Sequence, residues 1–210
     1  MRPALSVKDA LANPRRDFSR VVMPPMSYIH EQDKITKRWP AAEKYITENG
    51  LNEQFGPSQA PIGIAVQGGM YNNVIRALQR LGLANSFGDT DVPLYVLNVT
   101  YPLVKDEFLT FCQGKEAVLV VEEGQPEFIE QGFATLLNRA GNSTKLYGKN
   151  VLPMAGEYTG QAMLEGLTTF LHKAAPDMLA DNLRSPNAPV TPIPDLSKTV
   201  PIRPPGFCTG

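Results

Sequence analysis

The sequence predicts an α/β protein, a three-layer α/β/α sandwich built around a mostly parallel sheet. Short apolar runs alternate along the chain with segments whose apolar residues recur at helical spacing. One of these runs, residues 117–121, is apolar at every position, as a strand covered on both faces must be. Strands that alternate with helices favour a parallel sheet with helices on both of its faces.

Four strands are expected in the body of the chain. The first two are IGIAV (62–66) and LYVLNV (94–99), and AVLVV (117–121) is the third. The more polar run STKLYG (143–148) is expected to form a fourth strand at an edge of the sheet. These runs are too short for helices and carry the branched side chains typical of strands.

Helices are expected between these strands. The first follows the Gly68-Gly69 turn and stops at Gly82, and a brief one covers residues 105–112. A third follows the acidic turn after residue 121, and the last runs over about 160–173. In each of them apolar residues recur at helical spacing, which predicts one buried face.

The two ends of the chain differ from this body, which gives three expected parts. Residues 1–56 are an N-terminal arm with a linker helix, because RVVMPPMSYIH has a double proline and no sustained period. The arm is expected to be extended to about residue 40, with a short helix from Pro40 to Thr47. The α/β domain covers 57–175. Residues 176–210 hold eight of the nineteen prolines and should lie extended across another surface.

The composition excludes several classes of protein. The formal net charge is −1, so the chain has no signature of nucleic-acid binding. Its longest apolar runs are far too short to span a membrane, and the first residues lack the apolar stretch of a signal peptide. The two cysteines, Cys112 and Cys208, do not make a disulfide framework, and a cytoplasmic location is expected.

Three turns stand at the expected carboxyl ends of the strands, where open parallel sheets bind their ligands. They are QGGMYNN (67–73), NVTYPL (98–103) and EEGQPEF (122–128). The glycine turn does not follow GxGxxG, so we interpret it as a tight turn with close helix–sheet packing. Glu122 and Glu123 could do acid–base work, but with no catalytic group beside them we favour capping and interface ion pairs.

The sequence motifs predict no catalytic site, no cofactor-binding site and no complete metal site. His30 and His172 are the only histidines, and neither is in a strand-end turn beside a nucleophile. No His/Cys pair has the spacing of metal ligands. Gly88-Asp89 could open a thiamine-type metal motif, but the asparagine that this motif needs farther along is missing.

The stretch LNVTYPLVKDEFLTFCQGKEAVLVVEEGQPEFIEQ (97–131) resembles the middle of indolepyruvate ferredoxin oxidoreductases. These are thiamine-diphosphate-dependent 2-oxoacid:ferredoxin oxidoreductases. The segments 20–43, 67–83, 148–159 and 201–210 support the resemblance, which therefore covers nearly the full length. The large, fused bacterial form is the most similar.

The resemblance implies a transketolase C-terminal-like middle domain, with one antiparallel strand at a sheet edge and missing catalytic domains on either side. Thiamine diphosphate, Mg²⁺ and [4Fe–4S] clusters would belong to the longer parent enzyme, and none to this segment. Cys208 would be the first cysteine of a CxxC cluster motif, and so an iron–sulfur ligand in the parent only. The segment alone is expected to be inactive.

The resemblance also implies a reaction and partners for the parent. It would oxidatively decarboxylate aryl 2-oxoacids to acyl-CoA and reduce ferredoxin, and it would be a homodimer. In this chain, one strand-end surface is expected to face the other domains of the polypeptide. Its residues are Gln67, Gly68, Gly69, Tyr71, Asn72, Asn73, Tyr101, Glu122, Glu123, Gly124 and Gln125.

Two rival functions stay open. A free-standing flavodoxin-like module would bind a flavin or nucleotide at the glycine turn, and micromolar binding of such ligands would support it. A non-enzymatic oligomerisation scaffold would form a stable oligomer that dissociates when residues 1–40 are removed.

Overall fold

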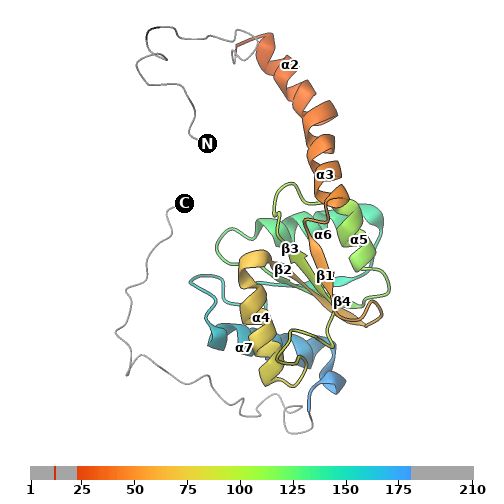
Figure 1. Ribbon diagram of the computed structural model, residues 1–210, viewed down its shortest axis with the longest axis vertical. Helices are drawn as coiled ribbons and strands as arrows, with labels where there is room; N and C mark the ends of the chain where they lie inside the picture. The colour runs from red at the N-terminus through yellow and green to blue at the C-terminus, as the bar shows by residue number, and fades with distance from the viewer. Residues whose placement is uncertain (1–11, 13–22, 181–210) are drawn as a thin grey trace.

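A five-stranded sheet forms the centre of the computed structural model, which describes residue 12 and residues 23–180 (Figure 1). The strand order is β1-β3-β2-β4-β5, and only β1 runs antiparallel to its neighbour. The strands are β1 (Glu53–Phe55), β2 (Ile62–Gln67), β3 (Leu94–Leu97), β4 (Ala117–Val121) and β5 (Lys145–Tyr147).

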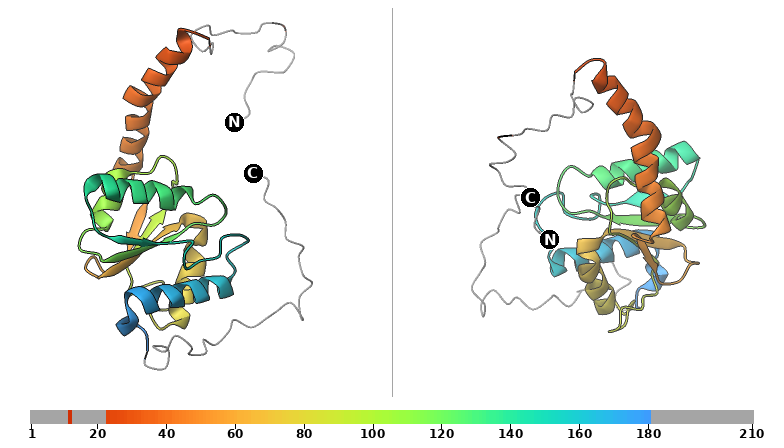
Figure 2. Two further views of the ribbon diagram at one scale, coloured as in Figure 1. Left: turned by 180° about the vertical axis from the view of Figure 1, so that it is seen from behind. Right: turned by 45° about the horizontal axis from the view of Figure 1, so that its top comes forward.

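Helices cover both faces of this sheet, which confirms the predicted three-layer sandwich. One face is covered by α4 (Tyr71–Arg80) and α7 (Gly160–Ala174), which pack against each other. The other is covered by α5 (Lys105–Phe111) and α6 (Phe128–Ala140) (Figures 1 and 2). The predicted helices and the four predicted strands are therefore all present, with β5 at the edge as expected.

Alternation along the strands divides the core into two clusters. Ile64 and Val66 of β2 belong to the cluster under α4 and α7, whereas Ala65 belongs to the cluster under α5 and α6. All five residues of β4 are buried, because this strand has a neighbour on each side and a helix layer on each face.

The antiparallel edge strand that the resemblance implies is β1. No hydrophobic pattern in the sequence predicts this strand. Its three residues are all exposed, and it is held by its pairing with β3. The sheet thus begins at Glu53, ahead of residue 57. At the other end, the buried Leu179 still belongs to the core, beyond residue 175.

The extended path predicted for the arm is wrong for the described residues from 26 to 40. A continuous helix runs through α2 (Met26–Asp33), a π-helical segment η2 (Lys34–Arg38) and α3 (Trp39–Glu48), and it projects from the body (Figure 1). Only Ile46 is buried along it, so it lacks the apolar period that reveals a packed helix. Local pairs such as Lys37–Asp33 and Lys44–Glu48 support it instead.

Pro40 explains the π-helical segment in this helix. Proline has no N–H to donate, and its ring crowds the carbonyl four residues earlier. Directly before it, the Trp39 N–H bonds to the Lys34 carbonyl, five residues back, so the helix widens locally instead of breaking.

The expectations for residues 1–11, 13–22 and 181–210 lie outside the described residues. They include the extended proline-rich segment and the role of Cys208. Within the part of the chain that the structure describes, no helix is both long and apolar enough to cross a membrane.

Candidate functional site

The carboxyl ends of β2 and β4 meet at the point where the chain reverses its winding direction. The helix after β2 lies on one face of the sheet and the helix after β4 lies on the other, which leaves a crevice between the two strand ends. A hydrogen bond crosses it, with the Glu123 N–H donating to Gln67 Oε1 at 2.9 Å. The sequence therefore located this edge correctly.

The glycine turn beside this crevice packs closely at one of its two glycines. A Cβ at Gly68 would lie 2.6 Å from Asn98 Oδ1, whereas one at Gly69 would meet nothing within 4 Å. Neither glycine has a positive φ. Close packing at Gly68 is thus confirmed, and the turn borders a hollow of about 460 Å³ that also reaches Thr100 and Glu123.

Glu122 serves as the cap of α6. Its carboxylate accepts the Ile129 N–H at 2.9 and 3.0 Å and the Glu130 N–H at 3.1 Å, and the side chain is buried. A carboxylate at a helix N-terminus accepts hydrogen bonds from backbone N–H groups that have no partner within the helix. The helix dipole also stabilises its negative charge. Gly124 supplies the turn before the helix with a φ of 91°. The capping interpretation of Glu122 is therefore confirmed.

Glu123 ties this edge to the loop that precedes α7. Its Oε1 accepts the Tyr158 N–H at 2.6 Å, and Asn73 Nδ2 donates to the Tyr158 carbonyl at 3.0 Å. Lys149 Nζ bonds the Tyr158 hydroxyl at 2.6 Å, and this hydroxyl donates to the Pro153 carbonyl. These contacts hold the loop over the strand ends.

Burial governs the protonation of this polar cluster. Burial, followed by the neighbouring carboxylates of Glu122, Glu123 and Glu130, raises the pKa of Tyr158 to about 12. Burial lowers the pKa of Lys149, and the same carboxylates oppose that shift. The phenol thus stays neutral, and its hydrogen bonds persist at ordinary pH.

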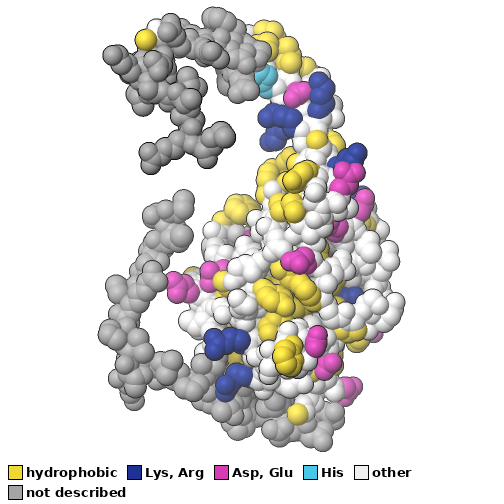
Figure 3. All heavy atoms as spheres, viewed as in Figure 1, with side chains coloured by type: hydrophobic (Ala, Val, Ile, Leu, Met, Phe, Trp, Pro, Cys, Tyr) yellow, Lys and Arg dark blue, Asp and Glu magenta, His cyan; other side chains and the backbone are white. Residues whose placement is uncertain are grey.

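An aromatic groove of about 1020 Å³ adjoins the crevice on the α6 side. Trp39 and Tyr101 form one wall in edge-to-face contact, 4.9 Å between ring centroids, and Phe128 stands on the α6 side. Tyr101 and Phe128 are each 69% exposed. Figure 3 shows hydrophobic side chains gathered where the projecting helix meets the body.

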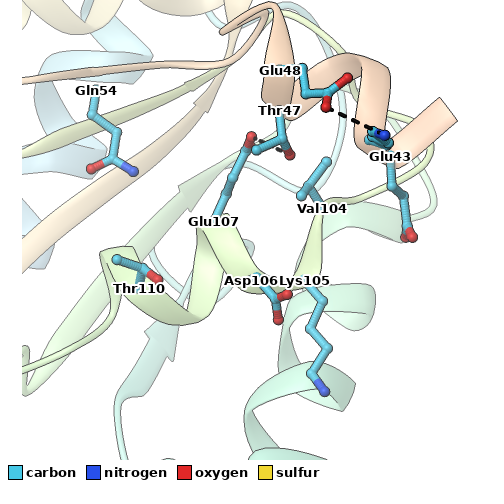
Figure 4. Close-up of a pocket in the computed structure, with 10 residues that line it drawn as sticks. Glu43, Thr47, Glu48, Gln54, Val104, Lys105, Asp106, Glu107 and Thr110 are labelled. Atoms are coloured by element: carbon cyan, nitrogen blue, oxygen red, sulfur yellow. Dashed lines mark hydrogen bonds and ion pairs between the residues drawn. The ribbon is translucent and has the colours of Figure 1, made fainter. Parts of the chain in front are cut away.

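A second cleft, of about 740 Å³, lies between α3 and α5 and is lined by several acidic side chains (Figure 4). Glu107 connects its two sides. Its carboxylate accepts hydrogen bonds from Thr47 Oγ1 at 3.1 Å, Asn52 Nδ2 at 3.0 Å and the Tyr95 hydroxyl at 2.8 Å. Burial, followed by this carboxylate, raises the pKa of Tyr95. The contacts fix the base of the projecting helix to the body.

The remaining residues of the predicted surface lie around the glycine turn and the groove. Tyr71 is half-buried against Phe55, 5.4 Å between centroids, and Asn72 is exposed. Gly124 and Gln125 are exposed at the groove rim. Sequence reasoning missed Trp39 and Phe128, and it missed the role of Tyr158. Only the position of Phe128 at the end of the EEGQPEF turn, before a predicted helix, offered a signal.

The donor set at this edge does not suit thiamine diphosphate with its magnesium ion. The carboxylates of Glu122 and Glu123 are already engaged by backbone N–H groups. Among residues 23–180, no three His, Cys, Asp or Glu side chains are grouped so that they could hold a metal. His30 is on α2 and His172 is on α7, so no triad forms.

The fold and this strand-end edge define a three-layer α/β domain with its candidate surface at the carboxyl ends of the parallel strands. The sequence profile described as "Indolepyruvate oxidoreductase domain" matches residues 52–170. The chain therefore belongs to the indolepyruvate oxidoreductase domain family.

Curated relatives are similar along the chain. The "Indolepyruvate oxidoreductase subunit IorA" of Methanothermobacter thermautotrophicus is 26% identical over all of this chain and 32% of its own length. Its counterpart in Methanothermobacter marburgensis is 30% identical over 80% of this chain and 28% of its own length. The chain thus spans about a third or less of these relatives.

One solved structure with a similar outline is a 2-oxoglutarate:ferredoxin oxidoreductase from Magnetococcus marinus. It matches 71% of this chain and 24% of its own chain, at 16% sequence identity and a TM-score of 0.47.

Proposed function

We propose that this chain is a structural and interface domain of an indolepyruvate:ferredoxin oxidoreductase. The parent enzyme oxidatively decarboxylates an aryl 2-oxoacid to an acyl-CoA and carbon dioxide, and it passes the electrons to ferredoxin. Family membership over residues 52–170, in a chain that spans about a third or less of its relatives, is the observation that carries this proposal.

The site chemistry supports a positioning role and not a catalytic one. The carboxylates of Glu122 and Glu123 accept hydrogen bonds from backbone N–H groups. The polar groups around Tyr158 are hydrogen-bonded to one another. The groups left accessible are those suited to contact another domain, above all the exposed Tyr101 beside the rim residues Gly124 and Gln125. Thiamine diphosphate, Mg²⁺, iron–sulfur clusters, CoA and ferredoxin belong to the other domains and partners of the parent.

Activity and dialysis measurements on the isolated chain test this proposal. The chain alone is expected to turn over no 2-oxoacid and to lose thiamine diphosphate during dialysis. Turnover of any 2-oxoacid by the chain alone, or retention of the cofactor, would refute the proposal.

The interface itself is tested with paired substitutions. Tyr101→Ala should weaken association with the other domains about tenfold, the effect of removing a central aromatic anchor. Phe87→Ala is the matched control, because Phe87 is 93% exposed and lines none of the hollows at the strand ends. Equal affinity of the Tyr101→Ala variant and the parent sequence would remove Tyr101 from the interface.

A further inference from the structure

Lys115, directly before β4, is a buried lysine without a neighbouring carboxylate. It is 7% exposed, and no acidic side chain among residues 23–180 forms an ion pair with it. Its Nζ lies 4.8 Å from the centre of the Phe111 ring and donates one long hydrogen bond, of 3.5 Å, to the Ser58 carbonyl. Buried charges in proteins are normally paired, so this ammonium group has unused capacity to attract an anion.

A glycine in the neighbouring strand gives this lysine its place. A Cβ at Gly63 of β2 would lie 3.0 Å from Lys115 Cε and 2.7 Å from Phe111 Cζ. The missing side chain therefore lets the lysine stem and the Phe111 ring pack close to the sheet. Burial lowers the pKa of the Lys115 amine, and the Cys112 thiol opposes this shift only in part.

A hollow of about 370 Å³ opens beside the amine, at the amino ends of the parallel strands. Lys115 and Ser58 both line this amino-end hollow, and apolar rings from Phe55, Pro93 and Phe111 line other parts of it. Among the described residues that line it, Lys115 alone carries a charge. The volume is within the range of sites that bind small molecules.

One positive charge beside apolar rings determines the kind of ligand that fits. A phosphate or a dicarboxylate carries more negative charge than one lysine neutralises, and the described lining offers no second basic group. The rings favour an apolar body on the ligand. We propose that the amino-end hollow binds a small aromatic monocarboxylate. Its carboxylate accepts hydrogen bonds from Lys115 Nζ, and its ring packs beside Phe111 and Phe55.

This site is separate from the surface described above. The strand-end surface is at the carboxyl ends of β2 and β4, whereas Lys115 precedes β4 and Pro93 precedes β3. The two are therefore at opposite edges of the sheet, and the proposal does not rest on the proposed function.

Calorimetric titration of the full chain tests the site, with benzoate as the probe and benzamide as its uncharged counterpart. Benzoate is expected to bind one-to-one. Benzamide should bind about tenfold more weakly or worse, because it cannot form the charge-assisted hydrogen bond.

Two lysine variants locate the bound benzoate. Lys115→Met keeps an apolar stem but removes the charge, so it should weaken benzoate binding about tenfold or more. Lys145→Met is the matched control, because Lys145 Nζ also lies over an aromatic ring, 4.9 Å from the centre of Tyr147, but at an exposed position. This variant should bind benzoate as the parent sequence does.

A second measurement needs no variant and decides the case if Lys115→Met does not fold. Acetylation of lysines by acetic anhydride is followed by peptide mass spectrometry of the full chain. Saturating benzoate should slow the acetylation of Lys115 about tenfold, since a rise of about one unit in its pKa lowers the reactive neutral fraction by that factor. Benzamide should not slow it, and the exposed Lys145 should react at the same rate throughout.

Three results would overturn the proposal. One is equal affinity for benzamide and benzoate, and another is unchanged benzoate affinity in the folded Lys115→Met variant. The third is the absence of both binding heat and protection of Lys115 at about 10 mM benzoate, where even a millimolar site would be nearly filled.

Discussion

Glu122 and Glu123 are neighbours in sequence, but the fold uses their carboxylates for different tasks. Glu122 holds the start of α6, and Glu123 holds the loop before α7. Their position at a strand end was evident from the sequence. Their partners were not, because Tyr158 is 35 residues away and contributes a backbone N–H, which every residue except proline possesses.

Replacing Glu122 by glutamine tests the cap. The amide has one acceptor oxygen in place of two and carries no charge. The hydrogen bonds that the Ile129 and Glu130 N–H groups donate are therefore weakened or lost. The free energy of unfolding should fall by about 1–2 kcal/mol, measured by urea denaturation. Glu116→Gln, at an exposed position, is the control and should change stability little. Equal stability of both variants would contradict the cap.

The raised pKa of Tyr158 predicts that the folded protein loses stability in alkaline solution. Its pKa is about 12 in the folded chain and 10.0 without the fold, so the folded state keeps its proton longer. The stabilisation is fully present below pH 10 and is lost as the pH rises to 12. Over this range the free energy of unfolding should fall by about 2 kcal/mol more than it falls in the Tyr158→Phe variant. Urea denaturation of both proteins over this range measures it. Parallel pH curves for the two would contradict the assignment.

At the scale of elements, hydrophobic periodicity predicted the strands and helices that form most of the core. The buried faces of α4, α6 and α7 and the runs of β2 and β4 carried strong signals. Periodicity failed for β1 and for the helix from Met26 to Glu48, because neither buries a continuous face. These elements depend on pairing with β3, on local ion pairs and on contacts at one end, which no window of hydropathy records.

Glu107→Gln should loosen the base of the projecting helix. Three donors share this carboxylate, and an amide group cannot accept from all of them. We expect a loss of about 1 kcal/mol in unfolding free energy, together with stronger quenching of Trp39 fluorescence by acrylamide. Asp106→Asn is the control, because it is an exposed carboxylate in the same cleft. If both variants behave alike, Glu107 does not hold the helix.

At the scale of the whole molecule, the described chain consists of a packed body and a helix that leaves it. The cores of the body involve every strand except β1, whereas residues 26–38 bury no side chain. The alternation of strand and helix patterns along the sequence identified the body as an α/β domain. It could not show how the arm leaves the body, because that direction depends on the contacts of Glu107 and Trp39.

Amide hydrogen exchange should reveal this division. Amides of residues 26–38 should exchange orders of magnitude faster than those of β2 and β4, since few contacts oppose local opening of an exposed helix. Mass spectrometry of peptides from the exchanged full chain measures the contrast. Comparable protection in both regions would mean that another surface covers the helix.

The length of the projecting helix sets the distance between its two ends. Its 23 residues, from Met26 to Glu48, span about 34 Å. The N-terminal end of the helix at Met26 is therefore held at a set distance and a set angle from the sheet. Adding or removing one residue within the helix would change that distance by only about 1.5 Å but would turn Met26 by about 100° around the helix axis.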